Sequence, residues 1–327
     1  AVPLMHSSCA WLREGCTTVL GCSALRSEAS LEDFFFSPLL PLPPLSPLRA
    51  LRSGMAGRVG PTLADPGCPA PALTTLLPLC LGFLGLAGII KRGVPVIIGP
   101  QDDAAMAVIE ARALRIGAPV LAFGQHWHVH EEHGRMVYQD ENGLLDLPLP
   151  NLPGPHQIHN AGAALTALRH LGATAAQCEA AVTKAFWPAR MQRLRHGPLV
   201  DLAPQVELWL DGGHNPAGGQ AVASTLARMP MRETHLICGM LNTKDVAGYM
   251  QPLATQVLQL FGVSIPNEKN TLLAAETVAA ARGAGIDAVE ADSVATALSE
   301  IATINPTARV LICGSLYLAG SILRENG

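Results

Sequence analysis

From about residue 206 to the C-terminus, short apolar segments alternate regularly with segments of helical periodicity. The apolar runs are short and rich in β-branched residues, which is typical of buried strands. The expected strands are VELWLDG, THLICGML, VLQLFGVSI, DAVEA and RVLICGS, and helices are expected from Pro216, near VAGYMQPLAT, over LLAAETVAAARGAG with Gly283 as its cap, and over SVATALSEIA. This βαβ series predicts an α/β fold, with a doubly wound, mostly parallel sheet that has helices on both faces.

Residues 87–186 also carry periodic segments, but in a different order. The segment GVPVIIGP predicts a buried strand, and the helix that follows it is expected to end at Gly117. APVLAFG predicts another strand, and residues 125–149 predict a β-meander with a turn at 141–143. Two helices are then expected, over HQIHNAGAALTALRHLG and TAAQCEAAVTKAF. The next segment, WPARMQRL, places Arg190 and Arg193 near an expected domain boundary.

Residues 1–86 have an anomalous composition. They contain no Lys, Ile, Asn, Gln or Tyr, although they are rich in Leu, Pro, Ser, Arg and Cys. Because proline recurs and neither strand nor helix periodicity persists, no fold is assigned to this segment. Residues 72–93 are nearly uncharged until Lys91 and Arg92, so a membrane span is one alternative, although Pro78 and three glycines weaken it.

Charge and cysteine usage limit the classes of partner. A formal net charge of −4 supplies no basic face, so neither nucleic acid nor an anionic membrane surface is an expected partner, and a small molecule is. The eight cysteines show no CxxC spacing, and reduced thiols in a cytoplasmic protein are expected.

Four histidines, at positions 126, 128, 130 and 133, lie in the predicted meander. Three of them have strand spacing on one face. A metal site needs three or four converging ligands, and no thiolate lies nearby in the sequence. Exposed strand histidines are therefore preferred to a metal site.

The segment LWLDGGHNPAGGQAV is the first strand-to-helix turn of the C-terminal series. Asn215 is expected to cap the helix and Pro216 to be its first residue. The unpaired N–H groups of such a helix suit a phosphate at the carboxyl edge of the sheet. Asp211 would repel a phosphate, so ribose hydroxyls or a cation are its expected partners. The alternative is a simple capping turn.

Six segments occur in one order along the chain: AGIIKRGVPVIIGP, GPHQIHNAGAAL, WPARMQRL, DGGHNP, GMLNTKD and VLICGSLYLAG. Together they resemble the bifunctional dihydrofolate synthase and folylpolyglutamate synthase of the Mur ligase superfamily. The resemblance extends from about residue 87 to the C-terminus.

This resemblance implies an ATP-dependent ligase of folate biosynthesis, which adds L-glutamate to dihydropteroate or a folate through an acyl phosphate. It also implies Mg²⁺ as a cofactor and a monomeric protein. Matched motif by motif, the residues implied to bind ATP are Asn160 of HQ..NA, Arg190 of WP.R, and Asp211 and His214 of DG.HN. Arg190 suits phosphate, Asn160 the adenine or phosphate region, and Asp211 the ribose.

The chain departs from the family in its first part. Its only lysines are at positions 91, 184, 244 and 269, and none follows the glycine-rich Gly-Lys-Ser/Thr pattern of a phosphate loop. The family's glutamate and histidine ligands of magnesium find no counterpart, so no catalytic or metal-binding residue is assigned. Gly85 and Leu86 stand where the family has Glu-Lys, and Lys91 is not taken as a substitute.

The sequence therefore predicts three parts: an anomalous segment 1–86, the remnant of a Mur ligase central domain over 87–189, and a C-terminal Rossmann-like domain over 190–327. Two functions stay open within the family, a working ligase and a truncated, inactive member that retains part of the nucleotide site. An unrelated membrane-anchored binding protein is a third reading. A further hypothesis is that residues 1–86 are translated out of the ancestral reading frame.

Overall fold

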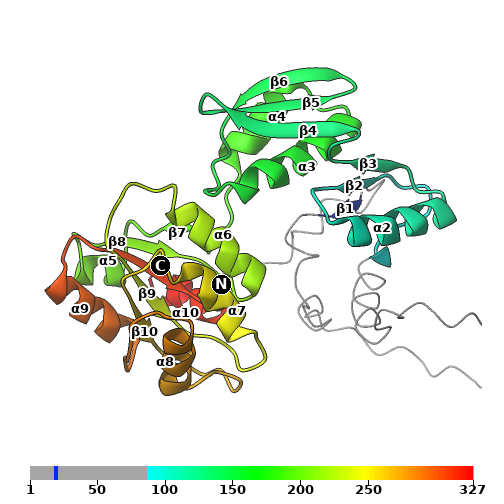
Figure 1. Cartoon of the computed structure of the whole chain (residues 1–327). Helices are drawn as coiled ribbons and strands as arrows, with labels where there is room; N and C mark the ends of the chain where they lie inside the picture. Colours follow the sequence, from blue (N-terminus) through cyan, green and yellow to red (C-terminus); the bar gives the residue numbers. More distant parts are fainter. Residues whose placement is uncertain (1–17, 21–86, 327) are drawn as a thin grey trace, which may run out of the picture.

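The structure is a computed structural model that describes residues 18–20 and 87–326 (Figure 1). The described residues form three sheets: a three-stranded parallel sheet, a three-stranded antiparallel sheet, and a six-stranded sheet in the C-terminal half. The predicted α/β class is confirmed. The hypotheses about residues 1–86 and most of the span at 72–93 fall outside the described residues.

The C-terminal sheet has the strand order β11-β10-β9-β12-β8-β7. Its strands are β7 (Gln192–Arg193), β8 (Glu207–Leu210), β9 (Thr234–Cys238), β10 (Gln259–Gly262), β11 (Ala288–Glu290) and β12 (Arg309–Cys313). All neighbours are parallel except β7, which runs antiparallel to β8 at the edge. The strands pack as buried apolar runs, with all five residues of both β9 and β12 buried, as expected of a sheet covered on both faces.

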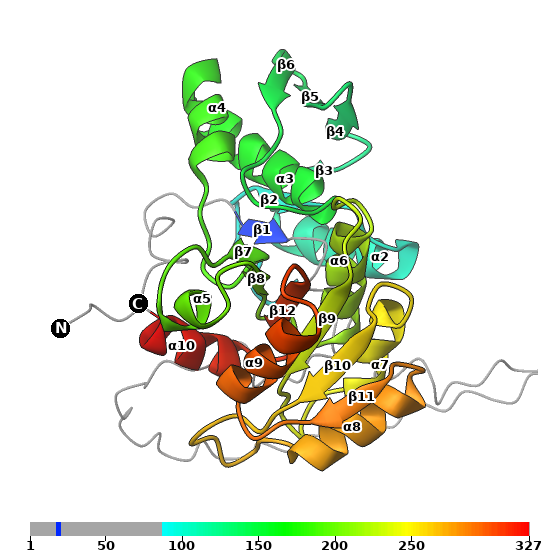
Figure 2. The same cartoon turned by 90° about the vertical axis from the view of Figure 1, so that its left-hand side faces the viewer.

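Helices cover both faces of this sheet (Figure 2). They are α5 (Pro198–Leu202), α6 (Pro216–Leu226), α7 (Val246–Met250), the 3₁₀ helix η3 (Gln251–Leu253), α8 (Ala274–Gly283), α9 (Val294–Ile304) and α10 (Leu316–Glu325). One apolar core joins the sheet to α9 and α10, and a second joins its other face to α6, α7 and α8. The doubly wound arrangement predicted from the sequence is confirmed.

The predicted helix caps agree with the structure except at one position. Gly117 has φ 67° and ends its helix as expected. Gly283, in contrast, is the last helical residue of α8, and Ala284 is its C-cap. Gly285, with φ 85°, takes the left-handed conformation that follows the helix. Both glycines follow the helical pattern, so sequence alone did not separate them.

The first described part of the chain holds the parallel three-stranded sheet. Its elements are β1 (Thr18–Leu20), β2 (Val96–Ile98), α2 (Asp103–Ile116) and β3 (Val120–Ala122). β2 is the central strand and pairs in parallel with both β1 and β3. The α2 helix packs on it through Ala105, Ile109 and Ala113, which are buried.

The predicted meander forms the antiparallel sheet, and two helices pack on it (Figure 1). Its elements are β4 (Trp127–Glu132), β5 (Arg135–Asp140), β6 (Gly143–Pro148), α3 (His156–His170) and α4 (Ala175–Lys184). The α3 helix approaches β4 closely at Gly162, where a Cβ atom would lie 2.6 Å from the Trp127 ring. His128 and His130 alternate with buried residues and are exposed on β4, as predicted.

Within residues 18–20 and 87–326, no helix has the length and apolar character needed to cross a membrane.

Candidate nucleotide site

The turn between β8 and α6 lies at the carboxyl edge of the C-terminal sheet, where parallel sheets bind their ligands. Asn215 caps α6, because its side chain accepts a hydrogen bond from the Gly218 N–H at 2.8 Å. Pro216 occupies the first helical position, as predicted. Pro216 has no N–H, and the Gly218 and Gly219 N–H groups bond to Asn215, so Ala217 supplies the remaining N–H of the first helical turn at this edge.

Asp211 directly follows β8 and is only 4% exposed. One carboxylate oxygen accepts the Gly213 N–H at 2.7 Å, and the other accepts the Met191 N–H at 2.8 Å. Burial raises the pKa of this carboxyl group above its ordinary value, while the two N–H bonds and the charges of Arg190 and His214 act in the opposite direction. Each oxygen of the Asp211 carboxylate therefore already accepts a hydrogen bond from the backbone.

Arg190 is held between two residues with unusual backbone geometry. Ala189 has φ 53° and Met191 has φ 42°, in the left-handed region that non-glycine residues seldom adopt. The Gly212 N–H donates to the Ala189 carbonyl at 2.8 Å, and the Ala189 N–H donates to the Gln192 side chain at 2.9 Å. These bonds and the bond from Met191 to Asp211 fix the segment against the turn, and the Arg190 side chain remains exposed.

His214 is half-buried on the same turn, and its Nδ1 lies 2.9 Å from the Gly212 carbonyl oxygen. Since a carbonyl oxygen only accepts, Nδ1 must carry the proton in this contact. The other ring nitrogen is then an acceptor when the imidazole is neutral. His214 can therefore accept a hydrogen bond from a hydroxyl or amino group of a ligand at this edge.

Asn160 lies apart from the turn, on α3. Its amide donates to Gln157 Oε1 at 3.1 Å, and Gln157 Nε2 lies 2.9 Å from Nε2 of His156. Burial, followed by the positive charge of Arg190, lowers the pKa of His156 from 6.5 to about 4. The positive charge of Arg190 thus acts on both the His156 imidazole and the Asp211 carboxyl group.

Sequence reasoning missed His156 and Gln157 as site residues, although both belong to the HQIHNA motif. Their neighbour Asn160 lines a small cavity of about 140 Å³ together with Gln157, whereas Arg190 lines a larger one. The structure therefore brings the backbone segment that carries Arg190 against the turn that carries Asp211 and His214, whereas Asn160 lies apart and bonds to Gln157.

Magnesium has no evident ligands in the described part of the chain. No group of three or more His, Cys, Asp or Glu side chains in residues 18–20 and 87–326 could hold a metal ion. Asp211, the acid of the turn, is occupied by backbone N–H groups. The donor set therefore does not fit Mg²⁺, which prefers carboxylate oxygens and water.

Comparison with known proteins agrees with this fold. Residues 189–316 match the family described as Mur ligase, glutamate ligase domain. The chain is 28% identical over 248 residues to folylpolyglutamate synthase of Lacticaseibacillus casei, covering 72% of this chain and 55% of that protein. It is 31% identical over 275 residues to dihydrofolate synthase/folylpolyglutamate synthase of Mycobacterium tuberculosis, covering 72% and 54%.

Among solved structures, folylpolyglutamate synthase of Mycobacterium tuberculosis complexed with ADP and AMPPCP is 25% identical, with a TM-score of 0.63. The match covers 75% of this chain and 59% of that one. This chain spans little more than half the length of these relatives.

The parallel sheet, its turn at the carboxyl edge and the family match give residues 189–316 the fold of a Mur ligase glutamate ligase domain. The chain resembles the dihydrofolate and folylpolyglutamate synthases.

Proposed function

We propose that the chain supplies the C-terminal sheet and part of the nucleotide site of an ATP-dependent ligase that adds L-glutamate to dihydropteroate or a folate. The observation that supports this most directly is the placement of Arg190 beside the turn at the carboxyl edge, fixed by hydrogen bonds at Ala189 and Met191. An exposed guanidinium beside the N-terminus of a helix forms an arrangement suited to phosphate oxygens.

In the proposed reaction, the γ-phosphoryl group of ATP passes to a carboxylate oxygen of the pteroate or folate, and ADP leaves. The amine of glutamate then attacks the acyl carbon, an amide bond forms, and inorganic phosphate leaves as the amine loses a proton. Arg190 would neutralise phosphate charge, and the α6 N-terminus would donate a hydrogen bond to a phosphate oxygen. His214 would accept a hydrogen bond from the nucleoside, and Asn160 would contact the adenine or phosphate region.

Asp211 has a different part in this proposal from the ribose contact implied by the resemblance. Its two carboxylate oxygens already accept hydrogen bonds from backbone N–H groups, and Asp211 is only 4% exposed. We propose that it is a positioning residue, which acts on the nucleotide by holding the Arg190 segment.

A second candidate function is nucleotide binding without ligation. The printed sequence has no Gly-Lys-Ser or Gly-Lys-Thr, so it lacks the loop that cradles ATP phosphates in the family. Removing a single hydrogen-bond donor that stabilises the transition state typically raises the activation free energy by about 3 to 4 kcal/mol. We therefore expect no detectable glutamate addition by the isolated chain.

Two measurements test these functions. Calorimetric titration with ADP should show saturable binding that weakens about tenfold or more in Arg190→Gln, since one charge-assisted phosphate contact is worth about 1.5 to 3 kcal/mol. Arg115→Gln, at the exposed end of α2, removes the same charge elsewhere and should leave the affinity unchanged.

The second measurement is incorporation of labelled glutamate into dihydropteroate or tetrahydrofolate, in protein free of host ligase. Turnover above a control without enzyme would establish the working ligase. ADP binding without turnover would establish the inactive member. Absence of ADP binding would contradict both.

A further inference from the structure

A cavity of about 480 Å³ lies along β7, and its lining begins beside the turn, at Arg190 and Met191. Its lining includes Leu323 at the far end of α10, whereas the turn lies at the helix start, where Leu316 contacts Gly212. Seven helical residues span about 10 Å, so this end of the cavity is separated from the turn along α10. No residue from Asp211 to Asn215 lines the cavity. Its volume falls in the range of small-molecule sites.

The cavity is positively charged. Arg190, Arg193 and Arg195 line it, and no aspartate or glutamate does. Arg190 and Arg195 are exposed, and neither forms an ion pair within 4 Å with any residue that the structure describes. The cavity therefore presents at least two guanidinium groups that form no ion pair with a described residue.

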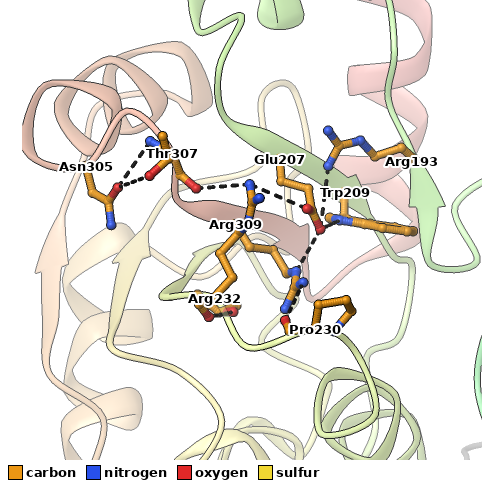
Figure 3. A network of polar contacts seen from close by, with 9 residues as sticks. Arg193, Glu207, Trp209, Pro230, Arg232, Asn305, Thr307 and Arg309 are labelled. Carbon is orange, nitrogen blue, oxygen red and sulfur yellow. Dashed lines mark hydrogen bonds and ion pairs between the residues drawn. The ribbon is translucent and has the colours of Figure 1, made fainter.

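Arg193 has a carboxylate partner, but it shares this partner with two other arginines. Glu207 lies among Arg193, Arg232 and Arg309, at N···O distances of 3.7, 3.5 and 2.9 Å (Figure 3). Its Oε1 already accepts hydrogen bonds from Arg309 and from the Trp209 indole. One carboxylate thus faces three guanidinium groups, and an excess of positive charge remains at this wall.

Arg193 is also held in place and has an unused donor. Its guanidinium carbon lies 5.7 Å from the centre of the Trp209 ring, a cation–π distance. Its Nη1 is buried 3.7 Å from Glu207 Oε1 and makes no hydrogen bond with a described residue. The contact with Glu207 is therefore an ion pair without a hydrogen bond, and it leaves the hydrogen-bonding capacity of Nη1 unused.

Aromatic side chains form the other walls. Phe186 and Trp187 line the cavity beside Trp209, although they are 65% and 43% exposed. Large aromatic side chains next to unpaired arginines are typical of sites that stack a planar ring and bind its anionic groups.

We propose that this cavity binds a small molecule that has a planar aromatic ring and at least two anionic groups. The ring stacks on Trp187 or Phe186, and the anionic groups pair with Arg193 and Arg195. An aromatic dicarboxylate and a nucleoside diphosphate both have this chemistry. The proposal does not depend on the ligase activity, since the cavity shares only Arg190 and the adjoining Met191 with the nucleotide site.

Calorimetric titrations of the full chain with 4-aminobenzoylglutamate and with ADP test this site. We expect at least one probe to show binding that weakens about tenfold, equivalent to about 1.4 kcal/mol, in Arg195→Gln. Arg195 is exposed, so this variant should fold normally. Arg193→Gln should weaken the same binding, and Arg115→Gln is the charge-matched control that should not. The probe that responds to Arg195→Gln identifies the ligand class.

ADP bound at the turn would respond to His214→Ala and not to Arg195→Gln, which separates the two sites. Tripolyphosphate has charge but no ring, and we expect it to bind about tenfold more weakly than the responding probe. The proposal is wrong if neither probe shows binding sensitive to Arg195, or if tripolyphosphate binds as tightly as the aromatic probe.

Discussion

The carboxylate of Asp211 accepts a hydrogen bond from the backbone N–H of Met191 at 2.8 Å, although the two residues are 20 positions apart in the chain. This bond connects the residue that follows β8 to the segment that presents Arg190. Ala189 and Met191 both have positive φ, and such a conformation costs about 1 to 3 kcal/mol per residue. The strain persists because the turn holds the segment from both sides of Arg190.

We therefore predict that Asp211→Asn lowers both stability and ADP affinity. The amide retains one acceptor oxygen, but its NH₂ group cannot accept the second backbone N–H. The expected loss of unfolding free energy is about 1 to 3 kcal/mol, measured by urea denaturation. Asp201→Asn, on the exposed face of α5, is the matched control. Equal effects of the two substitutions would contradict the positioning role.

A buried ion pair fastens α3 to the antiparallel sheet. Arg169 donates two hydrogen bonds to Asp140, at 2.7 and 2.8 Å, and their side chains are 11% and 8% exposed. Burial alone would raise the pKa of Asp140, but hydrogen bonds from Arg169 and Asn142 together with the charge of Arg169 lower it.

Asp140→Asn is expected to destabilise the protein by about 3 to 5 kcal/mol, since it leaves Arg169 buried without its counter-charge. Thermal and urea unfolding would measure the loss. Asp146→Asn breaks a similar pair with Arg135, whose side chains are 56% and 48% exposed, and should cost less than about 1 kcal/mol. A small effect at Asp140 would show that solvent reaches this pair.

Much of the fold follows from the sequence because apolar runs and helix signals agree along the C-terminal half. Leu208 and Leu210 alternate with less buried residues on β8, and the cap at Asn215 and Pro216 appears where predicted. The sequence does not determine the C-terminal end of α8, since Gly283 and Gly285 satisfy the same local pattern.

The site was predictable only in part, because its geometry depends on contacts between distant segments. The motifs located Arg190, Asp211 and His214, but no local pattern shows that Met191 donates to Asp211 across the chain. Likewise, the left-handed conformation of Ala189 and Met191 contradicts their local preferences. The cavity along β7 combines residues from four separate segments and has no motif of its own.

The folding stability should depend on pH through His156. Burial and the charge of Arg190 lower its pKa to about 4, and the contact with the Gln157 amide nitrogen requires an unprotonated Nε2. Between pH 6.5 and 4 the unfolded chain takes up a proton that the folded chain does not. Stability should therefore fall as pH falls through this window, by roughly 3 kcal/mol at most, and level off below it.

Urea unfolding at several pH values, compared between the parent chain and His156→Gln, measures this contribution. The difference in unfolding free energy between the two should change between pH 7 and 4 and remain constant above pH 7. His170→Gln removes an exposed histidine at the end of the same helix and serves as the control. A pH dependence that is the same in His156→Gln and the parent chain would contradict the assignment.

The last prediction concerns the division of the chain near residue 190. A fragment of residues 190–327 should fold by itself, because the C-terminal sheet has an apolar core on each face, formed almost entirely by residues of this fragment. Ala189 is the exception: it is 7% exposed, belongs to one core, and accepts the Gly212 N–H. A fragment that begins at 187 should therefore be more stable, by about 1 kcal/mol for the recovered hydrogen bond. Cooperative thermal unfolding and amide exchange would measure both fragments. A fragment of residues 190–327 with no cooperative transition and no protected amides would contradict an independent domain, and equal stability of the two fragments would show that the bond from Gly212 to Ala189 does not stabilise it.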